Sequence, residues 1–212
     1  MRIAVIQATS QKDKNALLAS EVKRVAGPLG HIVTNYGVFG NEDRAVSYVE
    51  AAVNISLLLC SGTEDFVVTG CSSGQGMMLA LNSLPGVLCG YTPTPQDAFL
   101  FGRINDGNAV SIPLGLGFGW CGEISLRSIV EGLFNGPFGT GYPLGDAERK
   151  MRDTRILKQI NSVTKRGFIE TMEALNPDFL ARALTWEEVT QAVLQKSEIT
   201  EIKEWLIKRM SR

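Results

Sequence analysis

The chain is poor in the residues that build metal centres. It has 212 residues with a single histidine, His31, and four cysteines, no two of which form a CxxC pair. Such a set excludes the usual structural zinc sites. The formal net charge is only −1, which argues against a basic surface for nucleic acid or anionic lipid. We therefore expect no zinc site and neither a nucleic-acid nor a membrane partner.

Long apolar runs are also missing. No stretch of about 18 apolar residues occurs, and no basic segment followed by an apolar one opens the chain. We therefore expect a cytoplasmic protein whose cysteines are free thiols. Hydrophobic residues make up 44% and charged residues 20%, which is typical of a globular protein with a core. The length fits one domain with an appendage.

The most informative stretch runs from residue 66 to 82 and reads FVVTGCSSGQGMMLALN. An apolar β-type run leads through a glycine-rich turn into a helix, a layout that points backbone N–H groups at an anion or a sugar oxygen. Cys71 lies in that turn, where the helix N-terminus favours the thiolate. The pattern indicates a catalytic thiol. The alternative is an inert buried cysteine in a common α/β turn, and spacing alone does not decide between them.

Strand-like and helix-like segments alternate over the first 134 residues. Strands are expected at residues 2–6, 31–36, from 66, 86–91 and 109–114, with helices between them, at 45–60 and 96–104 for example. Ser10 is a candidate cap for the first helix, and Pro113 favours an edge position for the fifth strand. The alternation predicts an α/β fold: a doubly wound, Rossmann-like, five-stranded parallel sheet with helices on both faces.

A glycine- and proline-rich loop at residues 135–145 separates this part from a helical tail. We expect a core at 1–145 and a helical extension at 146–212, packed on the core or on a partner subunit. Helices are predicted at 147–163, 186–194 and 199–210.

Ligands of such sheets bind at the carboxyl ends of strands. This rule gathers the loops 7–15, 70–76 and 91–96 around one cleft, with the polar INDGN segment, 104–108, as a fourth candidate. The INDGN segment precedes the fifth strand, so turn formation and ligand contact both remain open for it.

These motifs together resemble the sugar-phosphate isomerase family that includes ribose-5-phosphate isomerase B and galactose-6-phosphate isomerase. The match covers roughly residues 1–160 and rests on LGHIVTNYG, GCSSGQGM followed by Asn82, PGVLCGY and INDGNAVSI, in that order. The resemblance implies an aldose–ketose isomerase that works through a cis-enediolate without metal or cofactor. It also implies a homodimer, or a dimer of dimers, with active sites at the subunit interface.

The resemblance also implies roles for single residues. Cys71 matches the base that moves a proton between C1 and C2, and Ser73 stands in the same catalytic turn where the family usually has threonine. Arg152 and Arg155 match arginines that bind the phosphate, often from the neighbouring subunit. They share a helix face, and a solvated surface is the alternative interpretation of the pair. The full set of expected substrate-binding residues is Ser10, Ser72, Gly74, Gln75, Gly76, Asn105, Arg152 and Arg155.

The sequence departs from the family at its histidines. The Asp-His pair that follows the first strand in the family is replaced around Ala8 and Thr9, and the ring-opening histidine is replaced by Ile104. His31 matches a structural position. A substrate that is already open-chain needs neither group. The tail, together with NYGVFG, FGWCGE and GTGYP, is similar to a longer branch that includes a ketol-isomerase of 4-deoxy-L-threo-5-hexosulose uronate. A carboxylate then replaces the phosphate. A non-catalytic sugar-binding regulatory module is the third possibility.

Overall fold

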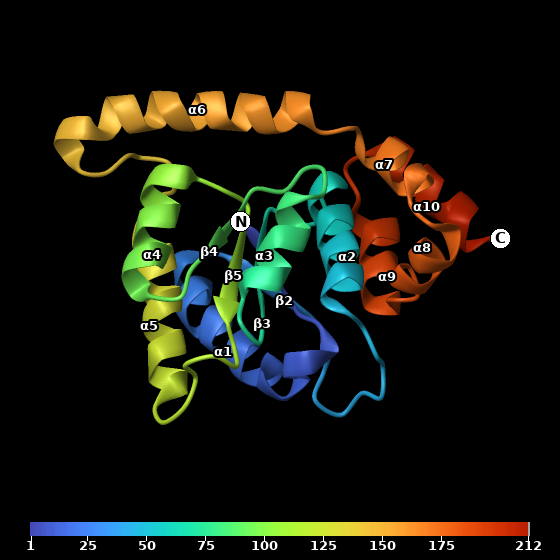
Figure 1. The fold of residues 1–212 in the computed structure, drawn as a ribbon, viewed down its shortest axis with the longest axis horizontal. Coiled ribbons are helices and arrows are strands. Elements are labelled where there is room, and N and C mark those ends of the chain that lie inside the picture. The colour runs from blue at the N-terminus through green and yellow to red at the C-terminus, as the bar shows by residue number, and fades with distance from the viewer. Residues whose placement is uncertain (212) are drawn as a thin grey trace.

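The computed structural model describes residues 1–211, and its centre is one sheet of five parallel strands (Figure 1). The strand order is β2-β1-β3-β5-β4. The doubly wound α/β fold predicted from the sequence is thereby confirmed. The strands are β1 (Arg2–Ile6), β2 (Ile32–Gly37), β3 (Phe66–Cys71), β4 (Cys89–Tyr91) and β5 (Ala109–Pro113).

Helices cover both faces of the sheet, so the inner strands are buried on each side. In β1, Ile3 and Val5 pack toward one face, while Ala4 and Ile6 pack toward the other. This is why these strands consist of continuous apolar residues rather than alternating ones. The first face is covered by α1 (Asn15–Ala26), α4 (Pro95–Leu100) and α5 (Gly122–Phe134), the second by α2 (Tyr48–Cys60) and α3 (Gln75–Asn82).

Helix α2 begins where its sequence provides a capping box. The Ser47 hydroxyl accepts a hydrogen bond from the Glu50 backbone N–H at 3.3 Å, and the Glu50 carboxylate accepts one from the Ser47 N–H at 2.8 Å. Both otherwise unpaired donors are satisfied. The helix therefore begins three residues later than the predicted 45. Its residues from Ala51 to Leu58 are buried, because the sheet lies on one side and the C-terminal helices lie on the other.

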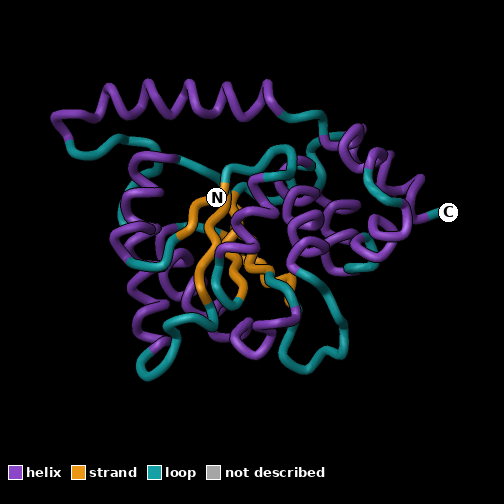
Figure 2. The backbone as a smooth tube through the Cα atoms, viewed as in Figure 1, coloured by secondary structure: helices purple, strands orange, loops and turns teal. Residues whose placement is uncertain are grey.

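The tail forms two different structures. Helix α6 (Ala147–Thr164) runs across one end of the sheet and stands apart from the other helices (Figure 2). The remaining helices pack side by side against α2 and bury Trp186 and Leu206 in the same cluster as one sheet face. The division at 145/146 stays a prediction. The packed helices of the tail are α7 (Phe168–Ala174), α8 (Pro177–Ala183), α9 (Glu187–Lys196) and α10 (Thr200–Met210). Helices α7 and α8 were not predicted from the sequence.

The packed tail holds the loop between β2 and α2. The Trp186 indole N–H donates to the Tyr36 carbonyl at 2.9 Å, and Arg44 makes two hydrogen bonds, of 2.8 and 3.1 Å, to Glu188. On the other side of this loop, the Thr9 hydroxyl donates to the Arg44 carbonyl at 2.9 Å. The loop from residue 38 to 47 is therefore fixed between the segment that follows β1 and the C-terminal helices.

Three sequence expectations are wrong. Strand β5 lies between β3 and β4, so it is not an edge strand. Proline is tolerated in this inner strand because Pro113 is its last residue, where the missing N–H interrupts no hydrogen bond of the sheet. The fourth strand is shorter than predicted, at Cys89–Tyr91. Ser10 does not cap α1: it lies in a 3₁₀ segment, η1 (Thr9–Lys14), and the residue at the N-cap is Lys14. Within residues 1–211, none of the helices has the length and apolarity of a membrane span.

Candidate active site

The candidate site lies at the carboxyl ends of the strands, where the strand order reverses. The chain passes from β1 to β2 on one side of β1, and β3 lies on its other side. In open α/β sheets, ligands bind in a crevice at such a switch point. We use the word crevice for the region between η1, which follows β1, and the turn Ser72–Gly74, which follows β3.

Two glycines let the turn after β3 approach β5. A Cβ on Gly70 would lie 2.2 Å from the carbonyl oxygen of Ile112. Gly74 has a φ of +75°, and a Cβ there would lie 2.8 Å from the Tyr91 ring and 2.9 Å from the Pro113 backbone nitrogen. Any side chain at either position would push the turn away from the sheet. Gly74 is also the N-cap of α3, and it has no side chain to cap the first-turn N–H groups.

Cys71 is the last residue of β3 and is partly exposed. One side of the residue packs against the hydrophobic cluster beneath α2 and α3, and its carbonyl accepts a hydrogen bond from Leu114 N–H at 2.9 Å. Cys71 therefore lies at the crevice with a fixed backbone, just before the N-terminus of α3.

The other cysteines differ in their surroundings. Burial raises the pKa of the Cys60 thiol and raises that of Cys89 to about 12, so neither is set up as a base. Cys121 is exposed and lies at the N-cap of α5, at the same edge of the sheet as Cys71. Its position makes it a useful experimental control.

Side chains that the sequence patterns did not single out also reach the crevice. Gln11 Nε2 donates to Ser72 Oγ at 2.9 Å, and Lys14 Nζ donates to Gln11 Oε1 at 3.1 Å. The Tyr48 ring lies 3.7 Å from the place that a Cβ on Gly76 would occupy. The only sequence signal for Gln11 and Lys14 is their place in the loop after the first strand. Ser10 lies in that loop as well and is exposed.

Asn105, Arg152 and Arg155 lie at the opposite edge of the sheet from Cys71. Helix α6 is bound to segments that precede strands: Thr154 Oγ1 donates to the Ile104 carbonyl at 2.6 Å, and Asn161 Nδ2 donates to that of Val87 at 3.3 Å. Figure 1 shows α6 across the end of the sheet where the strands begin. The expectation that the INDGN segment joins the cleft of its own chain is therefore wrong.

The INDGN segment forms the turn that its composition allows. Asp106 adopts a left-handed φ of 49°, and the Asn108 side chain accepts from Leu88 N–H and donates to the Gly86 carbonyl. Asn105 is exposed and borders a hollow of about 330 Å³ that Asp97 and Leu157 also line. It is thus open to a ligand, on the side away from Cys71.

The two arginines are solvent-exposed on α6. The Arg152 side chain is 62% exposed, with its nearest carboxylate, that of Asp153, 3.5 Å away, and Arg155 is exposed as well. Within one chain the pair forms a solvated helix face. One chain therefore unites Cys71 with Ser72, Ser73, Gly74, Gln75 and Gly76, but not with Asn105, Arg152 or Arg155.

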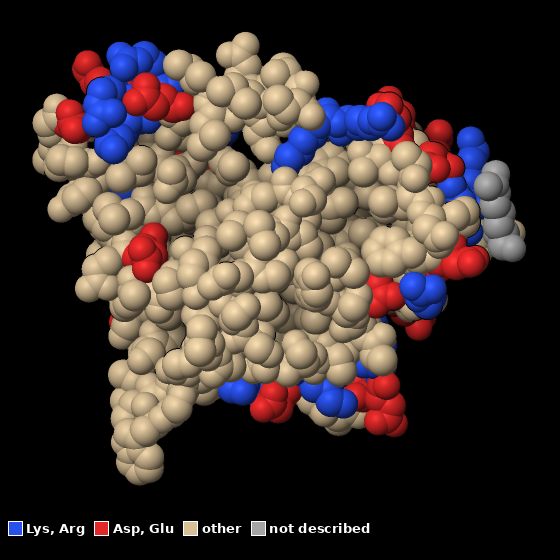
Figure 3. Space-filling model, viewed as in Figure 1, with Lys and Arg blue, Asp and Glu red and all other residues tan. Residues whose placement is uncertain are grey.

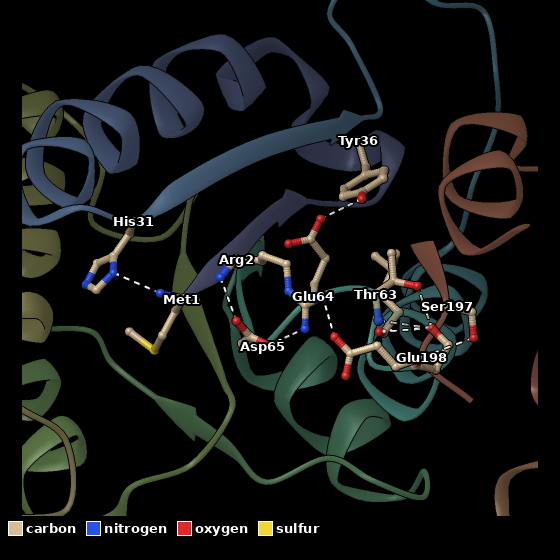
Figure 4. Close-up of polar contacts among 11 residues, drawn as sticks. Met1, Arg2, His31, Tyr36, Thr63, Glu64, Asp65, Ser197 and Glu198 are labelled. Atoms are coloured by element: carbon tan, nitrogen blue, oxygen red, sulfur yellow. Dashed lines mark hydrogen bonds and ion pairs between the residues drawn. The ribbon is translucent and has the colours of Figure 1, made fainter. Parts of the chain in front are cut away.

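His31 makes the contacts of a structural residue. Its Nδ1 lies 3.1 Å from the amino group of Met1, and its ring lies 5.8 Å from that of Phe134 (Figure 4). Burial and the nearby N-terminal ammonium lower its pKa. The residue immediately precedes β2, at the edge of the sheet opposite Cys71. Among residues 1–211, no three His, Cys, Asp or Glu side chains gather as metal ligands.

Comparison with known proteins decides the family. Residues 3–144 match the family model described as ribose/galactose isomerase. The chain belongs to this family. A 4-deoxy-L-threo-5-hexosulose-uronate ketol-isomerase, solved with a tartrate, is 38% identical over the whole of both chains, with a TM-score of 0.95. A ribose-5-phosphate isomerase from Vibrio parahaemolyticus is 37% identical over 99% of each chain, with a TM-score of 0.93.

Shorter members of the ribose/galactose isomerase family share the fold. The type B ribose 5-phosphate isomerase from Trypanosoma cruzi matches 77% of this chain and 99% of its own, with 21% identity and a TM-score of 0.63. No match was found among curated proteins. The family and its full-length neighbours are isomerases, and the chain is an isomerase of the same fold.

Proposed function

We propose that the chain interconverts the aldose and ketose forms of a small anionic sugar through a cis-enediolate, with Cys71 as the base. One observation carries the proposal: a partly exposed cysteine ends β3 at the switch point, before a turn that leads directly into α3. The turn is held against β5 by contacts that only glycine allows.

In this reaction the Cys71 thiolate removes the proton from the carbon next to the carbonyl of the open-chain sugar. The electron pair of that C–H bond forms the enediolate double bond, and the carbonyl oxygen O1 takes the negative charge. The hydroxyl hydrogen then passes from O2 to O1, which moves the negative charge to O2. Return of the carbon-bound proton to C1 forms the C2 carbonyl and completes the isomerisation. A positioned base contributes about 10²–10⁴-fold. Each N–H of the turn from Ser72 to Gly76 that faces the oxyanion adds on the order of 3 kcal/mol, and Ser73 stands beside these donors.

We propose that a second subunit supplies Asn105, Arg152 and Arg155, in a homodimer of the cytoplasm. The face over α3 supports this proposal. No charged residue occurs between Asp65 and Asp97, and the Leu79 side chain on α3 is 63% exposed. Figure 3 shows the corresponding face almost free of charged side chains. A two-fold contact here pairs each surface with its own copy and allows the carboxyl edge of one sheet to meet α6 of the other. The guanidinium groups of Arg152 and Arg155 on that α6 then bind the anionic group of the substrate.

Two classes of substrate fit this site. The first is a sugar phosphate of the ribose 5-phosphate or galactose 6-phosphate type. The second is a keto-uronate such as 4-deoxy-L-threo-5-hexosulose uronate. The lack of a ring-opening histidine favours this second class, because a substrate that is already open-chain needs no ring opening. Ile104 occupies the position of a ring-opening histidine, and His31 is bound to the N-terminus at the far edge. The neighbour named for that uronate is similar over its whole length.

Deuterium incorporation from D₂O tests the reaction directly, because binding alone exchanges no carbon-bound hydrogen. The panel consists of ribose 5-phosphate, galactose 6-phosphate and the keto-uronate. We expect exchange next to the carbonyl of at least one substrate, its loss in Cys71→Ala, and its retention in Cys121→Ala. Exchange at the wild-type rate in Cys71→Ala would remove the cysteine from the mechanism. A wild-type protein that exchanges none of the three would leave a sugar-binding module.

The arginines are tested through binding. Arg152→Ala is expected to raise KM at least tenfold for the anionic substrate while changing kcat little, since the guanidinium holds the anion throughout the reaction. Arg149→Ala is the matched control. Arg149 lies one turn away on α6 and is paired with Asp146 and Asp153. Equal KM values for the two variants would show that Arg152 does not bind the anion and is only a surface residue.

A further inference from the structure

A chain of hydrogen bonds crosses the crevice between β1 and β3. Gln11 lies in η1, after β1, and its side-chain amide donates to Ser72 Oγ, after β3, at 2.9 Å. Lys14 Nζ donates to the oxygen of the same amide at 3.1 Å. The backbone carbonyl of Gln11 in turn accepts from Gln7 Nε2, and the Gln7 side chain is fully buried at the end of β1. Both the backbone and the side chain of Gln11 are therefore held in place.

Lysine fixes the direction of these hydrogen bonds. An ammonium group only donates, so the amide oxygen of Gln11 must face Lys14 and its NH₂ must face Ser72. The opposite orientation would place two donors against each other. Because the Ser72 hydroxyl accepts the bond from Gln11, its own hydrogen is not used in that bond. It is free to point elsewhere.

The surroundings of Lys14 keep its ammonium group next to the side-chain amide of Gln11. Its side chain is only 22% exposed, and Nζ lies 5.1 Å from the centre of the Phe118 ring, in the segment that follows β5. A cation over an aromatic face is stabilised there. The Asp13 carboxylate is 3.5 Å away but is itself 73% exposed, so it contributes little.

Ser72 is itself fixed and open on one side. Its carbonyl accepts from Gly115 N–H at 3.0 Å and from Leu116 N–H at 2.7 Å, and its side chain directly follows Cys71. The residue is exposed despite these bonds. The free hydroxyl hydrogen thus belongs to an exposed residue that directly follows the proposed base in the chain.

We propose that Lys14 and Gln11 are positioning residues that turn the Ser72 hydroxyl into a hydrogen-bond donor for the oxygen of the substrate carbonyl, where negative charge develops. The inference rests on the proposed isomerisation and adds to it a donor from a side chain. The donor stabilises the enediolate in the same way as the backbone N–H groups of the turn.

Gln11→Glu tests the direction of the bonds with almost no change in shape. A carboxylate only accepts, so it takes a bond from Lys14 and a second one from the Ser72 hydroxyl, whose hydrogen is then lost to the substrate. We expect kcat to fall by about 10²-fold with KM changed less than threefold, because the missing donor acts on charge that appears in the transition state. Ser72→Ala is expected to lose a similar factor.

The double variant distinguishes this role from a merely structural one. If Gln11 acts through Ser72, Gln11→Glu adds less than a threefold loss on the Ser72→Ala background. Multiplying losses would overturn the inference. Asp13→Asn is the control, because it removes the nearby carboxylate while leaving the Lys14–Gln11–Ser72 bonds, and it should keep the wild-type rate.

Failure of this inference and failure of the proposed function give different results. A wild-type protein without deuterium exchange contradicts the isomerisation itself. A wild-type protein with exchange, together with a Gln11→Glu variant within threefold of its kcat, contradicts only the role of Gln11. Thermal unfolding of each variant shows that the fold is kept, and Lys14→Met provides the second approach: it frees the amide to rotate and should lower kcat without a larger effect on KM.

Discussion

Gly74→Ala adds one methyl group at the point where the turn after β3 meets β4 and β5. A non-glycine residue in the left-handed region costs about 1–2 kcal/mol, and φ at Gly74 is +75°. The new Cβ would also lie 2.8 Å from the Tyr91 ring and 2.9 Å from the Pro113 nitrogen. Relieving such overpacking costs about 1–3 kcal/mol. The free energy of unfolding should therefore fall by about 2–5 kcal/mol, a large part of the 5–15 kcal/mol typical of a domain.

Gly76→Ala is the matched control, two residues further along in helix α3. Gly76 lies in the first turn of α3 without a positive φ, and the nearest atom to an added Cβ is 3.7 Å away, in the Tyr48 ring. Alanine gains about 1 kcal/mol over glycine in a helix. Urea unfolding should therefore show a lower midpoint for Gly74→Ala and an unchanged or higher one for Gly76→Ala. The rate should follow the same order, because only Gly74→Ala displaces the turn that carries Cys71. Equal midpoints would refute the packing argument.

Three further predictions concern contacts outside the candidate active site. Trp186→Phe removes the donor to the Tyr36 carbonyl and should lower the free energy of unfolding by about 1–3 kcal/mol in urea titration. Burial raises the pKa of Glu64 above its ordinary 4.5, so ionising it costs native stability as pH rises; the advantage of Glu64→Gln over the wild type should grow as the pH rises above 4.5, and a constant difference would contradict this. Arg44→Gln should cost no more than about 1 kcal/mol because the pair with Glu188 is partly exposed, and adding Glu188→Gln should cost little more.

The fold was predictable wherever local pattern and burial agree. The continuous apolar strand at Phe66 and the helical stripe of Leu18 and Val22 are dictated by the two-sided burial of the sheet, and the structure has both. Strand order is different, because crossovers between distant segments set it. The edge position predicted for the fifth strand from Pro113 is wrong. A proline that ends a strand interrupts no hydrogen bond of the sheet, so it says nothing about which strands lie beside it.

The candidate site was predictable only in part. A glycine turn between a strand and a helix is a local signal, so the sequence was sufficient to place Cys71 at the carboxyl edge. The position of Arg152 depends instead on which end of the sheet α6 reaches, and no spacing in the sequence encodes that. Gln11 belongs to no pattern at all. Its importance comes from three hydrogen bonds, to Gln7, Lys14 and Ser72, which exist only after folding.

The loop between β2 and α2 has a consequence for how this enzyme can change. One side of it contacts the segment that carries Gln11, through Thr9, and on the other side Arg44 contacts Trp186 and Glu188 of the tail. Under the proposed function, we therefore expect a mutation in the tail to alter the outline of the crevice without changing any residue of the catalytic edge. We expect substrate preference to respond to such residues on the outside of the molecule as well.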